Sequence, residues 1–177
     1  MTRWLVGCAA VVAVALGLWA FEPWRLVTSS TVDEPLPSSA TPANGSAVPE
    51  RQERPAAVRS PRDRVLASGR FEAAEHATSG SARLLELGDG RRFLRLEDLA
   101  TSDGPDLHVW LSDQPSGGDW GSYDDGRYLR LGGLTATHGN QNYAVPADAA
   151  LRGLVSVVIW CDRFNVAFGS APLLTRP

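Results

Sequence analysis

Lysine is absent from this sequence, so arginine supplies all 17 basic residues, against 20 acidic ones. The net charge of -3 at pH 7 argues against nucleic acid or another polyanion as a partner. The arginine bias is typical of a GC-rich bacterial genome and is not in itself a sign of phosphate binding, although arginine suits bidentate anion contacts. No segment repeats with a period of roughly 20 to 50 residues, which excludes a solenoid or a propeller.

Cysteine and methionine are scarce. The two cysteines are Cys8 and Cys161, and Met1 is the only methionine. Type-one copper needs two histidines and a cysteine, usually with an axial methionine, so we predict no metal site. The motifs G-x-S-x-G, H-E-x-x-H, C-x-x-C, G-x-G-x-x-G and the Walker loop are also missing, so hydrolase, zinc protease and nucleotide-binding functions have no support and enzymatic activity stays open.

Residues 4–21 form an uninterrupted run of apolar and small residues, preceded by Arg3. A helix of that length spans about 27 Å, close to the roughly 30 Å hydrocarbon core of a bilayer. We predict that residues 1–25 are an uncleaved signal anchor, which makes the chain a single-pass protein of the cell membrane with its C-terminal part outside the cytoplasm. A cleaved signal peptide and lipidation of Cys8 are the alternatives.

Residues 26–63 are rich in proline, serine, alanine and threonine and contain no aromatic residue. Such a segment cannot bury enough apolar surface to offset the entropy lost when it becomes ordered. We predict a disordered, partly extended linker that holds the following domain at a distance from the lipid.

Residues 64–175 have the pattern of an all-β domain. Short apolar runs recur about every ten residues, separated by glycine, aspartate, asparagine and proline, which is typical of a single antiparallel β-sandwich or barrel-like domain. The clearest hairpin turns at Gly88-Asp89-Gly90, and residues 147–151 hint at a helical turn. The candidate strands are 65–72, 81–87, 92–98, 107–112, 128–131, 142–145, 155–161 and 165–168.

Alternation along a strand predicts which side chains share a face. Between residues 107 and 111, the odd positions are apolar and the even positions are His108 and Trp110. Between residues 155 and 161 the odd positions are again apolar. We predict that these odd positions face the core, with Cys161 at its rim and Trp160 on the opposite face.

Cys161 is the candidate for chemistry. An unpaired cysteine in an exported domain suggests a reactive thiol, a bond to another chain or a bound cofactor, whereas the alternative is a small buried hydrophobe. Haem needs only one or two axial ligands, which cysteine or histidine can supply, but the sequence does not identify a cofactor. The candidate residues are Cys161 for redox chemistry, and Cys161, His108 and Trp160 for holding a group.

The stretch Gly139-Asn-Gln-Asn-Tyr143 carries three amide side chains and a tyrosine. Its simplest interpretation is a turn bonded to itself. It also belongs to a set of four stretches that are specific in combination. The other three are Gly69-Arg-Phe71 with His76-Ala-Thr-Ser-Gly80, then Asp103-Gly-Pro-Asp-Leu-His-Val-Trp-Leu-Ser112, and Val157-Val-Ile-Trp-Cys-Asp-Arg-Phe-Asn-Val-Ala-Phe-Gly169.

Together these stretches resemble the DM-thirteen domain family, over about residues 65 to 174. That family is proposed to transfer electrons and also occurs in Skeletor-type animal cell-surface proteins, often beside a haem-binding domain of the dopamine monooxygenase N-terminal type. The resemblance implies a β-sandwich-like fold and a redox role for Cys161, either as a bare thiol or as a ligand of a group such as haem. It further implies a separate redox partner protein. The competing hypothesis is a non-catalytic binding or structural module of the cell envelope.

Overall fold

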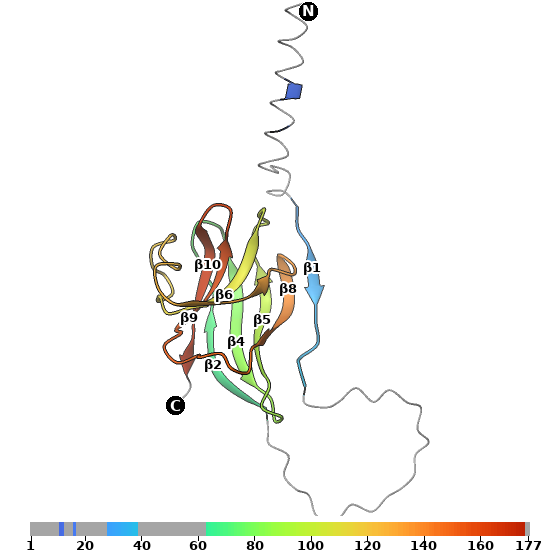
Figure 1. Cartoon of the computed structure of the whole chain (residues 1–177). Coiled ribbons are helices and arrows are strands. Elements are labelled where there is room, and N and C mark those ends of the chain that lie inside the picture. Colours follow the sequence, from blue (N-terminus) through green and yellow to red (C-terminus); the bar gives the residue numbers. More distant parts are fainter. Residues whose placement is uncertain (1–10, 13–15, 17–27, 39–62, 176–177) are drawn as a thin grey trace, which may run out of the picture.

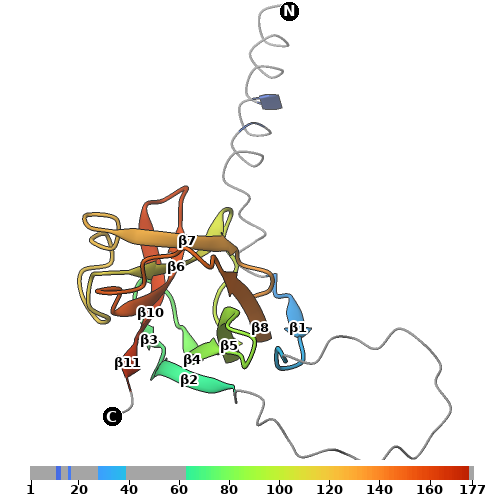
Figure 2. The same cartoon turned by 60° about the horizontal axis from the view of Figure 1, so that its bottom comes forward.

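The computed structural model describes residues 11–12, 16, 28–38 and 63–175 (Figure 1). The described part of the domain is all-β, with two sheets that face each other, as Figure 2 shows for β6 and β7 above β4 and β5. One sheet has the order β1-β8-β5-β4-β2-β11 and the other β3-β10-β9-β6-β7. Neighbouring strands are antiparallel except β1 and β8, so the predicted antiparallel sandwich is confirmed for this region.

The strand boundaries follow the apolar runs of the sequence. The strands are β1 Thr31–Asp33, β2 Arg64–Arg70, β3 Glu72–Ala73, β4 Ser79–Glu86, β5 Arg92–Ala100, β6 Leu107–Ser112, β7 Tyr128–Gly133, β8 His138–Val145, β9 Ser156–Cys161, β10 Val166–Pro172 and β11 Leu174–Thr175. The predicted turn joins β4 to β5, where Gly90 has a φ of 86° and its amide donates to the Leu87 carbonyl at 2.9 Å. Residues 147–151 form turns and no helix.

The core lies between the sheets and is made by alternate residues. Leu94 and Leu96 of β5 meet Val109 of β6 and Ile159 of β9 there, all with 0% exposure. The prediction that the odd positions face inward is therefore confirmed for residues 107, 109 and 111 of β6 and for residues 157, 159 and 161 of β9. It is wrong for Val155, which precedes β9 and is 41% exposed.

The outer face of β6 and β9 is buried as well. Trp110, Val158 and Trp160 form a second cluster with Tyr123, which comes from the loop between β6 and β7. Trp110, Trp160 and Tyr123 are each 1% exposed. Strand alternation did not predict this cover, because it is supplied by a loop and not by a strand.

Residues 28–38, part of the predicted linker, are ordered and carry β1, which pairs with β8 in parallel register. The amino-acid composition did not indicate this strand. Residues 28–38 are ordered by their contacts with β8 and not by apolar side chains of their own. Of the predicted anchor at residues 1–25, only residues 11, 12 and 16 are described, and they are helical; the rest of the apolar run at residues 4–21 lies outside the described residues. No helix in the described part of the chain is long and apolar enough to cross a bilayer.

Candidate functional site

Cys161 is the last residue of β9 and lies between two neighbouring strands. Its Cα pairs with that of Leu107 in β6 and with that of Val166 in β10. The side chain belongs to the core cluster together with Ile159, and its exposed fraction is 0%. Cys161 is thus part of the core at the end of β9, and no part of its side chain reaches the surface.

The surroundings of Cys161 favour the protonated thiol. Burial raises the pKa of the thiol and is the largest influence on it. The backbone amides of Phe164, Arg163 and Asp106 lower this pKa in part, and the negative charge of Asp106 raises it. Since the thiolate is the form that attacks disulfides and ligates metals, the raised pKa makes Cys161 a weak nucleophile at neutral pH.

The geometry around Cys161 does not suit haem. An axial ligand needs open space on the side where the iron and the porphyrin lie, and Cys161 has no exposed surface. His108 and Trp160 are Cα partners on the outer face of the sheet, one position away from the Leu107–Cys161 pair, whose side chains face the core. The three predicted cofactor-binding residues therefore do not converge on one pocket.

Aromatic rings stack on the outer face of this sheet. The Tyr128 and Trp110 ring centroids are 4.3 Å apart with planes inclined by 8°, and those of Trp110 and Trp160 are 4.8 Å apart with planes inclined by 27°. The guanidinium of Arg130 lies 4.7 Å from the centroid of Trp110. Nε1 of Trp110 is buried and has no hydrogen-bond partner among the described residues. Tyr128 is 38% exposed, so the stack reaches from the surface to the residue beside Cys161.

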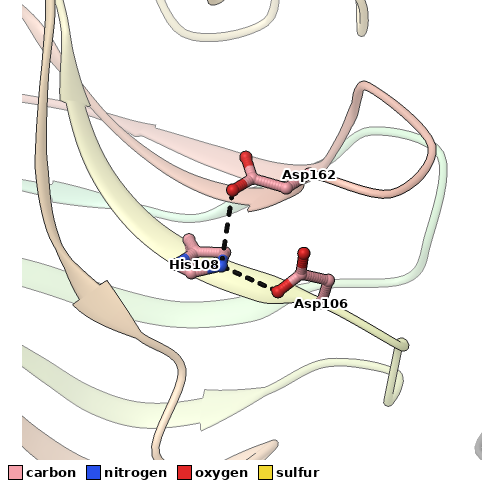
Figure 3. Close-up of side chains that lie close together, drawn as sticks. All are labelled: Asp106, His108 and Asp162. Atoms are coloured by element: carbon pink, nitrogen blue, oxygen red, sulfur yellow. Dashed lines mark hydrogen bonds and ion pairs between the residues drawn. The ribbon is translucent and has the colours of Figure 1, made fainter.

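His108 lies between two carboxylates (Figure 3). Its Nε2 is 2.9 Å from Oδ1 of Asp106 and 3.4 Å from Oδ2 of Asp162. Asp106 precedes β6 and Asp162 follows β9, so the antiparallel pairing of these two strands brings the acids together. The amide of Asp162 also donates to the carbonyl of Asp106 at 3.0 Å, which fixes the spacing of the two residues.

Arg130 of β7 adds a positive charge to this cluster. Its Nη1 and Nη2 lie 2.6 Å and 3.2 Å from the two carboxylate oxygens of Asp162. One imidazole nitrogen and two carboxylate oxygens within 4.8 Å of one another also form a ligand set for a divalent transition metal. Because Arg130 already neutralises Asp162, a metal would compete with an existing ion pair for that ligand.

The other two histidines have separate partners. The ring of His76 lies 3.9 Å from that of Phe168, and Nδ1 of His138 lies 2.9 Å from Oγ1 of Thr137. Within the described ranges, Cys161 is not part of a group of three metal-ligating side chains.

Sequence reasoning did not assign Asp106, Arg130 or Tyr128 to the site. Alternation correctly separated His108 and Trp110 from the core positions. The register of β7 against β6 brings Arg130 opposite Trp110, and register depends on pairing between distant parts of the chain.

Comparison with known proteins agrees with this picture. The family model described as electron transfer DM13 matches residues 70–173, more than half of the chain, including Cys161 and the His108 cluster. No curated protein matches the chain. No solved structure matches it. The resemblance seen in the sequence is confirmed, and the chain belongs to the electron-transfer DM13 family.

Proposed function

We propose that this protein is a membrane-tethered, extracytoplasmic electron carrier whose redox-active group is the Cys161 thiol. The family description supports the reaction class, and the apolar run of residues 4–21 supports the tether. The observation that carries the assignment to Cys161 is its complete burial next to an aromatic stack that reaches the surface.

Burial limits the chemistry open to this thiol. Disulfide exchange requires a thiolate that can contact the attacked sulfur, and oxidation to sulfenic acid likewise follows thiolate character and exposure. Cys161 has 0% exposure and a raised pKa, so both routes are disfavoured. Transfer of an electron through the surrounding side chains needs no direct contact with the partner.

The aromatic stack gives such a transfer a route. Tyr128 is partly exposed, Trp110 stacks on it, and Trp160 stacks on Trp110 and precedes Cys161 in the chain. Tyrosine and tryptophan are oxidisable side chains, so an oxidised partner protein at Tyr128 would draw an electron outward, from Cys161 through Trp160 and Trp110 to the surface.

Oxidation of Cys161 releases one electron and one proton. The S–H bond of Cys161 breaks, one electron passes to an oxidised one-electron carrier protein, and one proton leaves, so that a thiyl radical remains. The candidate proton acceptor is the carboxylate of Asp106, because Asp106 directly precedes Leu107, the Cα partner of Cys161. A reduced carrier returns the electron, and the proton restores the S–H bond.

The test uses the full chain in detergent and a photogenerated one-electron oxidant. We expect tryptophan radicals in the wild type to decay faster than in Cys161→Ser, because the thiol supplies an electron. Equal decay in two folded proteins would overturn the assignment to Cys161. The visible spectrum of the same samples reports whether a chromophore accompanies the chain.

The second candidate is a non-catalytic module of the cell envelope in which Cys161 only fills the core. Its complete burial and raised pKa favour this function, since buried structural cysteines are inert. It predicts that Cys161→Ser keeps its function in cells. A stably folded Cys161→Ser protein that loses function would contradict it.

A further inference from the structure

We infer that the edge of β8 is a binding site for an extended acidic peptide segment, and that residues 29–37 of the same chain occupy it. We call these residues the docked segment. They lie outside the part of the chain that matches the family. The pairing is parallel, with Thr31, Val32 and Asp33 opposite His138, Gly139 and Asn140.

Backbone bonds at both ends hold the docked segment in register. The amide of His138 donates to the Ser30 carbonyl at 2.9 Å, and the amide of Glu34 donates to the Asn140 carbonyl at 2.9 Å. The amide of Ser30 also donates to Oγ1 of Thr137 at 3.0 Å. This is strand addition to a sheet edge, in which the main chain supplies affinity and side chains supply selectivity.

The side chains of β8 select acidic residues. Nδ2 of Asn140 donates to Oδ1 of Asp33 at 2.6 Å, and the backbone and side-chain amides of Asn142 donate to Oε2 of Glu34 at 2.8 and 2.9 Å. Nδ2 of Asn142 also donates to the carbonyl of Pro35 at 2.9 Å. Two of the three amides that the sequence suggested were bonded within a turn therefore bind the docked segment.

A buried cation completes the site. Arg95 of β5 is 6% exposed, and its Nη1 donates to the carbonyls of Glu34 at 3.1 Å and Pro35 at 3.3 Å. A buried guanidinium is costly unless its donors are satisfied, and the docked segment supplies two of its acceptors. The ligand class is thus an extended segment with two consecutive acidic residues followed by proline. The proline carbonyl accepts hydrogen bonds from Arg95 and Asn142.

Gly139 allows the docked segment to approach. Its φ is +100°, and a Cβ at this position would lie 1.9 Å from the carbonyl oxygen of Val32. The edge is therefore shaped to admit another backbone at close range. Gly90 offers a matched control, since its φ is +86° and a Cβ there would meet nothing within 4 Å.

The docked segment and β2 are joined through residues 39–62, so both ends of that stretch belong to one domain. If the proposed membrane tether holds, the domain lies directly after the anchor and not at the end of a long stalk. The binding itself depends neither on the tether nor on the redox proposal for Cys161.

The experiment uses the full chain in detergent, with an N-terminal affinity tag and a specific protease site placed within residues 39–62. After cleavage on the affinity resin, we expect the β domain to stay bound through the docked segment. In Gly139→Ala it should elute about tenfold faster or more, as for loss of at least one strong hydrogen bond. Gly90→Ala should behave as the wild type does.

A second variant keeps the test informative if Gly139→Ala does not fold. Glu34→Arg lies in the docked segment and changes no residue of β5 or β8, yet it removes the acid that Asn142 binds and should release the domain. Immediate release of the wild-type domain, or equal retention of Gly139→Ala and Gly90→Ala, would overturn the inference. Uncleaved chains that elute as dimers would assign the edge to the segment of a second copy and overturn binding within one chain.

Discussion

The backbone amide of Asp106 faces the sulfur of Cys161, while the carboxylate of Asp106 lies 2.9 Å from Nε2 of His108. One residue thus connects the buried thiol with the charged cluster on the outer face of the sheet. The side chains of His108 and Cys161 themselves lie on opposite faces of the sheet.

The first prediction concerns stability against pH. The folded protein keeps the Cys161 proton at pH values where the unfolded chain loses it, because burial raises the thiol pKa. The contribution of the thiol to the free energy of unfolding should therefore be fully present below about pH 8.5. It should decrease as the pH rises from there to the raised pKa of the folded protein. Urea denaturation of the wild type and Cys161→Ser across this range measures the difference.

In Cys161→Ser, the free energy of unfolding should not show the decrease with pH that the thiol causes. Tyr143 also has a pKa raised mainly by burial, but both proteins share that contribution, so it cancels in the comparison. Parallel stability curves for the two proteins would show that the thiol does not keep its proton in the fold. Cys161→Ser itself should cost on the order of 1 kcal/mol.

A second prediction concerns the ligand set at His108. Arg130→Leu removes the ion pair that engages both oxygens of Asp162 and leaves one imidazole and two carboxylates. Zinc should bind this variant more tightly than the wild type, as measured by calorimetry. The double variant with His108→Gln should lose the gain, and an unchanged affinity in Arg130→Leu would show that the arginine does not compete with a cation.

A third prediction concerns the aromatic stack. Tyr128→Ala uncovers the Trp110 ring, which stacks on Tyr128 at 4.3 Å. The change should lower the free energy of unfolding by about 1 kcal/mol. It should also make tryptophan fluorescence easier to quench with acrylamide. Tyr128→Phe keeps the ring and is the matched control, so equal quenching in the two variants would argue against the stack in solution.

A fourth prediction tests close packing between the sheets. A Cβ at Gly69 would lie 1.8 Å from the carbonyl oxygen of Pro172, whereas one at Gly118 would lie 3.4 Å from its nearest neighbour. Gly69→Ala should lower the free energy of unfolding by about 1–3 kcal/mol and Gly118→Ala by less than about 0.5 kcal/mol. Thermal unfolding of the two variants decides, and equal midpoints would contradict the contact.

Local signals predicted the elements that depend on local chemistry. Alternation placed Cys161 on the inward face of β9, and the glycines near Asp89 marked the turn between β4 and β5. Residues 107–112 were predicted with the bounds of β6 because the run is apolar and ends at turn residues.

Features that depend on pairing between distant residues were not predictable in the same way. β1 carries few apolar side chains, and Asn140 and Asn142 of β8 give it a partner only after the sheet has formed. Likewise, Arg130 and Asp162 are far apart in the sequence, and only the registers of β7 and β9 against β6 bring them to His108.

The position of β1 has a consequence for behaviour at high concentration. β8 spans His138–Val145 and lies next to β1, the terminal strand of its sheet, so without β1 the outer backbone donors and acceptors of β8 would be open to another molecule. Exposed strand edges of this length are sites of intermolecular aggregation. The docked segment covers part of this edge with a chain that is acidic and contains Pro35 and Pro37, which should limit such association. Versions of the protein that begin after residue 38 should be less soluble than longer ones.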